Sequence, residues 1–336
     1  MTSEDAGSTG ERSLVERIPL RRLGGLAVGV GLVTILVVVA DPGAVARELA
    51  TTQIRWYLLG GACFLGGYLP ATLRWNHLQR TAGYPSDNMV AFEVLAVSYA
   101  LNQLLPVNAG DVTRTALVDR YYEVRSHSEL AGLVVVERAV DLCVVLGLLG
   151  AGSIAVASEL VPVKTFATGA VLIGGLAVAL AGLRWRAGTG PDFAGWLESV
   201  EWVPSAVAGP VDEFTAAVGR PPVRMLGVVS ILGVVRWLFV VVGFLLLGRA
   251  VGTSVGPALA GALVGGMSLT SVLPLTPGGV GPGETIGVSV LVVGGVDEPA
   301  AVVLVFLQRS FGLLWMAPLG VLVYLVRAVS GHPDRR

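Results

Sequence analysis

The sequence predicts an all-α, polytopic membrane protein with about six full transmembrane helices and two re-entrant or broken hairpins. Of its 336 residues, 54% are hydrophobic and only 14% are charged, whereas a soluble domain carries about 25% charged residues. Several apolar runs also approach the roughly 20 residues that a helix needs to cross a bilayer. The formal net charge of -1 excludes the strongly basic footprint of a nucleic-acid-binding protein.

Residues 1–22 are polar and are predicted to form a cytoplasmic N-terminus, followed by a single transmembrane domain over residues 23–328. The first span is Leu23–Ala40. A cleaved signal peptide ending near Ala40 is the alternative, but the run is long and the chain stays hydrophobic after it. The other apolar segments of the first half are separated by predicted connections at residues 41–55 and 74–88; these segments are Trp56–Trp75, Val90–Pro106 and Ala131–Ala157.

The second half contains five further apolar segments, which are Lys164–Leu183, Val223–Leu247, Gly256–Leu273, Val288–Val293 and Ala300–Val326. Residues 190–222 are less hydrophobic and are predicted to form an amphipathic surface segment. Residues 329–336 form a polar tail. Small residues between Ala258 and Gly266 predict a face on which two helices pack closely.

Two stretches at membrane depth cannot form continuous helices. Leu269–Gly287 contains three prolines, five glycines and the carboxylate Glu284. Broken backbone is tolerated in a membrane only where protein or a water-filled cavity satisfies it, so this stretch predicts a re-entrant, site-forming element. A similar but weaker break lies at residues 101–114, LNQLLPVNAGDVTR. Whether the two hairpins are re-entrant or fully spanning stays open.

The distribution of basic residues predicts that both termini are cytoplasmic. In this topology sixteen arginines fall in inside segments, while the outside segments hold only Arg47, Arg55, Lys164 and Arg249. This is the positive-inside bias. The two broken hairpins would then enter from opposite sides, as the halves of an inverted-repeat transporter do.

Charged residues inside the predicted spans are the candidate site, because burying a charge in a membrane is costly. Glu137 and Asp141 are four residues apart and share one helix face, with Arg138 beside them. Either this group is a structural ion-pair cluster, or Arg138 also faces a cavity and meets an anion. Arg309 has no acid nearby on its own span, so Glu284 is its predicted partner. Arg236 is either a further ligand or a side chain that reaches to the membrane interface.

The glycine-rich loop before Pro282 adds backbone donors to these charges. Gly278, Gly279 and Gly281 can present N–H groups, and a helix that begins near Pro282 would point its positive end at the same place. This combination suits a phosphate, although the lysine and Ser/Thr of a nucleotide-binding loop are missing. The three histidines are scattered, which predicts no metal site, and Cys63 and Cys143 are expected to be free thiols.

The motifs PLTPGGVGPGE (residues 274–284), LPVNAGDVTR (105–114) and VERAVD (136–141) resemble the flippase-like transmembrane region of the lysylphosphatidylglycerol synthase family. The resemblance runs from about residue 20 to 328. It departs from the family pattern at Pro106, which lies four residues before Gly110 rather than three, and at Asp111, where glutamate is usual. No aminoacyl-transferase domain follows Val326, so the resemblance implies a stand-alone, lipid-translocating member.

Together these observations predict a transporter that moves an anionic phospholipid or a polyprenyl-phosphate-linked headgroup between leaflets of the plasma membrane. The predicted substrate-binding residues are Arg138, Arg309, Arg236, Arg114, Gly278, Gly279 and Gly281, and their predicted charge partners are Glu137, Asp141, Glu284 and Asp111. No cofactor and no enzymatic activity are expected, since no Ser–His pair or metal cluster stands out. The alternative is a non-transporting scaffold for a lipid-modifying or glycosylating membrane enzyme.

Overall fold

The computed structural model describes residues 41–85, 87–104, 109–156, 213–270 and 281–329, together with Thr34 and Val38. Several predicted features lie outside these ranges: almost all of the first span, the span Lys164–Leu183, most of residues 190–222, and the loop positions Gly278 and Gly279. The regular elements within the described ranges are all helical. They are α2 (Pro42–Thr51), α3 (Ile54–Gly66), α4 (Tyr68–Thr81), α5 (Asn88–Leu104), α6 (Ala109–Asp119), α7 (His127–Val156), α11 (Val223–Val251), α12 (Pro257–Thr270), α13 (Pro282–Val293), α14 (Glu298–Ser310), the π-helical η3 (Phe311–Met316) and α15 (Ala317–Val329).

Two helical stretches in the described part of the chain are long and apolar enough to cross a membrane, Val223–Val251 and Glu298–Arg327. Only 28% of the most apolar window of the first is buried inside the protein, and side chains such as Ile231 and Leu238 stand exposed on it. Contiguous apolar surface of this kind is stable against lipid rather than water. The all-α class is therefore confirmed for the described residues, and these two helices agree with the predicted membrane protein.

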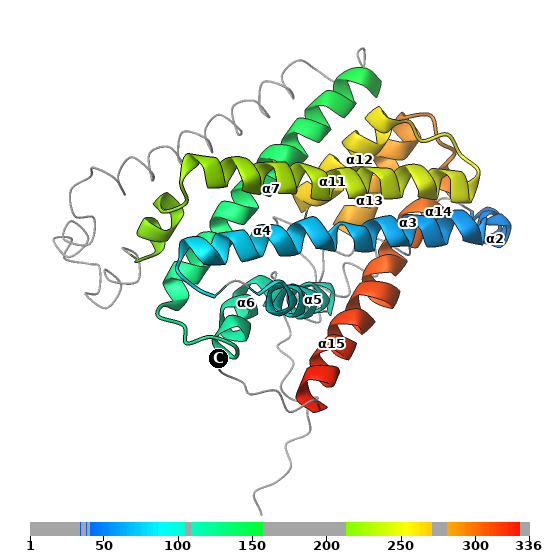
Figure 1. Cartoon of the computed structure of the whole chain (residues 1–336). Coiled ribbons are helices and arrows are strands. Elements are labelled where there is room, and N and C mark those ends of the chain that lie inside the picture. The colour runs from blue at the N-terminus through cyan, green and yellow to red at the C-terminus, as the bar shows by residue number, and fades with distance from the viewer. Residues whose placement is uncertain are drawn as a thin grey trace, which may run out of the picture.

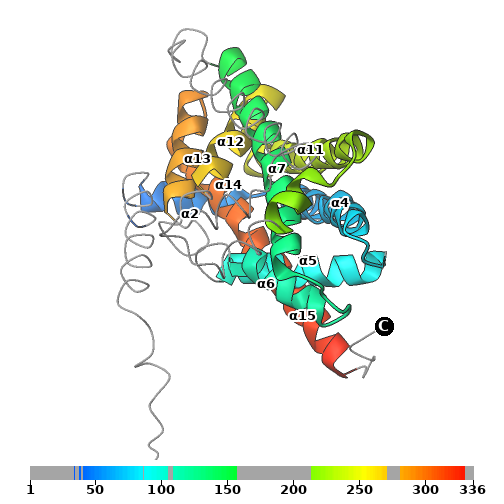
Figure 2. The ribbon, with the colours of Figure 1, turned by 90° about the vertical axis from the view of Figure 1, so that its left-hand side faces the viewer.

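The centre of the fold is an antiparallel pair made by α11 and the nearly continuous rod α3–α4, which lie side by side in both views (Figures 1 and 2). The Gln53 N–H at the start of α3 donates to the Ala250 carbonyl near the end of α11 (2.8 Å). Further along, a Cβ on Gly67 would lie only 3.4 Å from the Arg236 carbonyl oxygen. The two helical rods thus run in opposite directions at close range.

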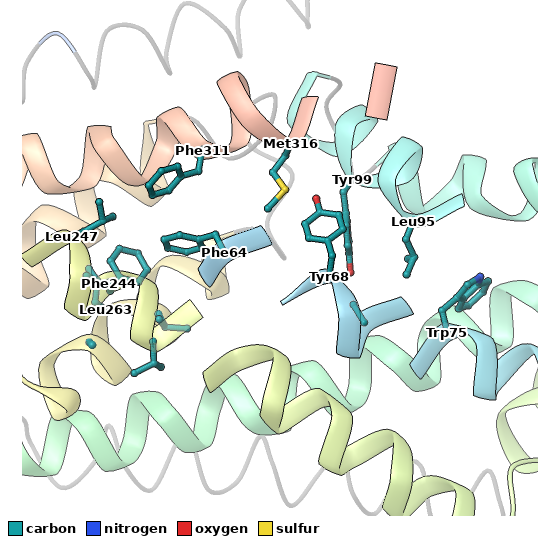
Figure 3. Close-up of a cluster of buried hydrophobic side chains, with 14 of the residues drawn as sticks. Phe64, Tyr68, Trp75, Leu95, Tyr99, Phe244, Leu247, Leu263, Phe311 and Met316 are labelled. Carbon is teal, nitrogen blue, oxygen red and sulfur yellow. The ribbon is translucent and has the colours of Figure 1, made fainter. Parts of the chain in front are cut away.

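Aromatic side chains fill the space between this pair and its neighbours (Figure 3). The Phe64 ring packs at 5.6 Å from Phe244 and 5.1 Å from Phe311, measured between ring centroids. Tyr68 on α4 and Tyr99 on α5 meet edge to face at 4.9 Å. These contacts join α3 to α11 and η3, and they join α4 to α5.

Two predicted connections are in fact largely helical. Residues 41–55 contain α2, because Asp41 caps the helix by accepting from the Gly43 N–H (2.9 Å) and Pro42 occupies its first turn. Residues 74–81 continue α4 rather than opening a loop. The chain reverses only after Thr81, at Gly83, whose φ of +80° glycine adopts readily.

The predicted small-residue packing face on α12 is confirmed. It lies against α7, with Gly261 next to the Leu148 carbonyl and Gly265 next to Leu149, while Gly152 of α7 faces Ala258 and Ala262 of α12. A comparable contact joins α15 to α5, where Gly320 sits against Ala96 and Ala100. The first helix of each short hairpin, α5 or α12, therefore packs on a helix that is distant in sequence: α5 on α15 and α12 on α7.

We expect Gly265→Ala to lower the stability of the folded protein by about 1–3 kcal/mol, because overpacking a tight contact forces the neighbours apart. The added Cβ would lie 2.4 Å from Leu149 Cβ and 2.8 Å from its backbone. Denaturant unfolding of the purified protein measures the change. Gly150→Ala is the matched control, since a Cβ there meets nothing within 4 Å; equal stability of the two variants would contradict the close α7–α12 packing.

Candidate functional site

Four helices bring seven charged side chains into one buried network. Its arginines come from α4, α6, α7 and α11, and its carboxylates come from α6 and α7. The members are Arg74, Arg114, Arg138, Arg236, Asp111, Glu137 and Asp141.

Glu137 is the innermost carboxylate and bridges two arginines. Its Oε1 accepts from Arg74 Nη2 and its Oε2 accepts from Arg114 Nη1, both at 2.7 Å. All three side chains are 0% exposed. Arg114 also lies over the Trp75 ring at 4.8 Å, which adds a cation–π contact. This triad joins α4, α6 and α7.

Asp141, one turn further along α7, gathers donors from three helices. Arg74 Nη1 donates to its Oδ1 at 2.7 Å and Trp237 Nε1 donates to the same atom at 2.9 Å. Arg236 Nη1 lies 3.3 Å from Oδ1, and Arg138 Nη1 lies 3.6 Å from Oδ2. Arg74 contacts both Glu137 and Asp141, so the prediction that these acids share one face is confirmed.

Asp111 near the start of α6 is the main partner of Arg138. It accepts from Arg138 Nε at 2.8 Å and from Arg138 Nη2 at 2.5 Å. It also lies 3.2 Å from Arg114 Nη2 and accepts from Asn102 Nδ2 at 3.3 Å. The predicted local pair of Arg138 with Asp141 exists, but it is longer than the two-point contact with Asp111.

Among the described residues, the network carries one more positive than negative charge, since its four arginines face three carboxylates. Its arginine side chains also differ in how much of their surface is exposed. Arg74 and Arg114 are fully buried, whereas Arg138 is 37% exposed and Arg236 is 17% exposed. The inner pair therefore anchors the acids, and the outer pair keeps exposed side-chain surface, although Arg236 Nη1 itself is buried.

Arg236 lies near the middle of α11, with its guanidinium 4.6 Å from the Trp237 ring and 5.7 Å from the Tyr99 ring. Its pairing with Asp141 and these aromatic faces direct it into the protein. This placement disfavours the interpretation that it reaches along the helix to the membrane interface.

A second ion pair joins the other hairpin to the last long helix. Arg309 Nε lies 3.5 Å from Glu284 Oε1, which is the pairing that the sequence predicts. α13 begins at Pro282, and Gly281, at a φ of +95°, donates its N–H to Glu284 Oε2 at 2.7 Å. The Gly281 amide, predicted to be a phosphate donor, thus binds this carboxylate in the structure.

Sequence reasoning missed three contributors: Arg74, Trp237 and Asn102. Arg74 lies within the predicted connection 74–88, and Arg114 is one of the sixteen arginines predicted to lie inside; in the structure both are buried ion-pair partners. The missed signal was the absence of any glycine between Tyr68 and Ala82, which lets the helix continue through Arg74. Among the described residues, no group of three or more His, Cys, Asp or Glu side chains could hold a metal ion.

The family model described as the lysylphosphatidylglycerol synthase TM region matches residues 23–320. The chain belongs to this family. A search of the curated proteins gave no match. Membership of this transmembrane family and the apolar helices together make the chain a membrane protein of a family related to lipid modification. The match includes the whole charged network and the Arg309–Glu284 pair.

Proposed function

We propose that the protein is a flippase-type transporter that moves the headgroup of an anionic phospholipid or a polyprenyl-phosphate-linked carrier between leaflets. The observation that carries this proposal is the net positive network, in which Arg138 and Arg236 are only partly covered. No cofactor and no covalent step are part of the proposal.

The arrangement favours an anion for electrostatic reasons. An uncompensated positive charge at membrane depth is costly, and a headgroup phosphate would neutralise the excess charge of the network. Guanidinium groups bind phosphate through two parallel hydrogen bonds, as Arg138 already binds the Asp111 carboxylate. A neutral headgroup would leave the excess charge in place.

The helix arrangement supports an inverted repeat, in which α3–α7 correspond to α11–α15. The central pair, α3–α4 and α11, runs antiparallel, and the first helix of each short hairpin packs on the final helix of the other half, α5 on α15 and α12 on α7. Transporters with inverted repeats bind near the membrane midplane and alternate access by moving one repeat against the other. We place the protein in the plasma membrane, with both termini cytoplasmic.

Lipid translocation in reconstituted vesicles tests the proposal. Headgroup-labelled phosphatidylglycerol would be the probe, and the loss of accessible label from one leaflet would be the readout. We expect Arg138→Ala to slow translocation about tenfold or more, because it removes charged hydrogen bonds to the headgroup.

Arg249→Ala is the matched control, since Arg249 lies on α11 like Arg236 but at its far end, over the Trp56 ring. Wild-type rates in folded Arg138→Ala and Arg309→Ala proteins would contradict the proposed role of these arginines. A wild-type protein that moves no lipid but co-purifies with a membrane enzyme would favour the scaffold instead.

A further inference from the structure

The two short hairpin helices carry a carboxylate at the same position. Asp111 is the third residue of α6 and Glu284 is the third residue of α13, and each follows a glycine, Gly110 or Gly283. Residues 105–108 and 271–280, which precede these helices and lie outside the described ranges, contain no ionisable side chain in the sequence. Glu284 is the only charged residue between 257 and 293.

Each of these carboxylates pairs with an arginine on the long helix that follows it. Asp111 binds Arg138 of α7 at 2.5 and 2.8 Å, and Glu284 lies 3.5 Å from Arg309 of α14. The same pairing thus occurs once in each half of the chain.

We propose that Asp111 and Glu284 are latches: in the absence of lipid, each occupies the position on its arginine that an anionic headgroup takes over. Displacement of the carboxylate frees the short helix of that half, and the two latches open alternately. This inference rests on the proposed function and adds the way in which the site is opened.

Exchange of a carboxylate for a headgroup requires that the headgroup reaches the arginine. The side chain of Arg138 is 37% exposed and that of Arg309 is 20% exposed, although Arg309 Nε and Nη2 are themselves buried. In contrast, Glu137 and its partners Arg74 and Arg114 are 0% exposed. Arg138 is therefore the more accessible of the two latch arginines, Arg309 is reached only in part, and the inner triad is closed to exchange.

Each displaced carboxylate also keeps a second partner on its own hairpin. Asp111 lies 3.2 Å from Arg114 and accepts from Asn102, and Glu284 accepts from the Gly281 N–H at 2.7 Å. The carboxylate therefore still has a partner after its arginine is released. A buried carboxylate with no partner would be far more costly.

The last turn of α5 connects the two latches. Asn102 donates to Asp111 and accepts from the Gly110 N–H at 2.7 Å. Its neighbour Gln103 lies against Gly312, where a Cβ would come within 2.6 Å of its side-chain oxygen. Gly312 belongs to η3, which directly follows α14, the helix of Arg309. The end of α5 thus contacts both α6 and η3. We expect a movement of α6 to shift η3 and, with it, the end of α14 that carries Arg309.

Equilibrium binding of phosphatidylglycerol tests the latches, with the full chain in phosphatidylcholine vesicles containing an increasing fraction of that lipid. We expect Asp111→Asn and Glu284→Gln each to bind it about three- to tenfold more tightly, since a competing ion pair is removed. Glu93→Gln is the control, because Glu93 pairs with Arg327 (3.2 Å) outside both latches, and its affinity should be unchanged.

A double variant separates displacement from a general charge effect. Asp111→Asn with Arg138→Gln should bind no more tightly than Arg138→Gln alone. Unchanged or weaker binding in both single neutral variants would overturn the latches, and if one variant fails to fold, the other decides. If the wild-type protein translocates lipid but these variants do not bind it more tightly, the latches are rejected and the transporter is not. If the variants bind the lipid more tightly but the wild-type protein translocates none, the transporter is rejected and the latches are not.

Discussion

Replacing Glu137 with glutamine should destabilise the folded protein by about 3–5 kcal/mol, the usual cost of removing one partner from a buried ion pair. Glu137 is 0% exposed and holds both Arg74 and Arg114, which are equally buried. Glutamine preserves the shape of the side chain but raises the net charge of the network by one. Unfolding of the purified protein in graded denaturant would measure the loss.

A second change should restore part of this stability. Adding Arg74→Met to Glu137→Gln returns the network to its original net charge, so the double variant should be more stable than the sum of the two single losses indicates. Additive losses would show that the two side chains are not coupled. The Glu93–Arg327 pair gives the comparison: its side chains are 12% and 25% exposed rather than fully buried, so Glu93→Gln should cost less than Glu137→Gln.

Gly110→Ala should be the most damaging glycine substitution in the described part of the chain. An added Cβ would lie 1.8 Å from the Ser98 carbonyl oxygen and 2.7 Å from Asn102 Oδ1. The first obstacle is backbone, so α6 would have to move away from α5. That movement would break the Ser98 and Asn102 hydrogen bonds to Gly110 and shift Asp111. We expect the free energy of unfolding to fall by about 3 kcal/mol or more. The yield of folded, monodisperse protein should fall with it.

Gly147→Ala is the control for this substitution. Gly147 is also helical, but a Cβ there meets nothing within 4 Å, so alanine should be neutral or should stabilise the helix by up to about 1 kcal/mol. A well-folded Gly110→Ala protein would mean that α5 and α6 do not lie as close as described.

The sequence predicts much of the fold because its elements are long and strongly apolar. The helices around Val223–Leu247 and Ala300–Val326 followed from composition and length, and the start of α13 at Pro282 followed from the Pro/Gly pattern. The Glu284–Arg309 pair was predictable because, in the sequence, each residue lies in an apolar stretch with no oppositely charged residue close by.

The centre of the network was less predictable, for a physical reason. In the sequence Arg74 follows an apolar run and precedes a polar one, so its charge and the interfacial character of Trp75 both favour a cytoplasmic end. Only the fold shows that α4 continues and that two acids of α7 meet Arg74 there. Tertiary contacts with α7 and α11, which are distant in sequence, decide this placement.

The central claim is that the partly exposed arginines of a net positive network select an anionic headgroup. Native mass spectrometry of the protein, purified from membranes and equilibrated with equal amounts of phosphatidylglycerol and phosphatidylcholine, tests it most directly. We predict that the wild-type protein retains phosphatidylglycerol in preference, and that the Arg138→Gln/Arg236→Gln variant loses this preference while staying folded. Equal retention of the two lipids by the wild-type protein, or an undiminished preference in the variant, would contradict the claim.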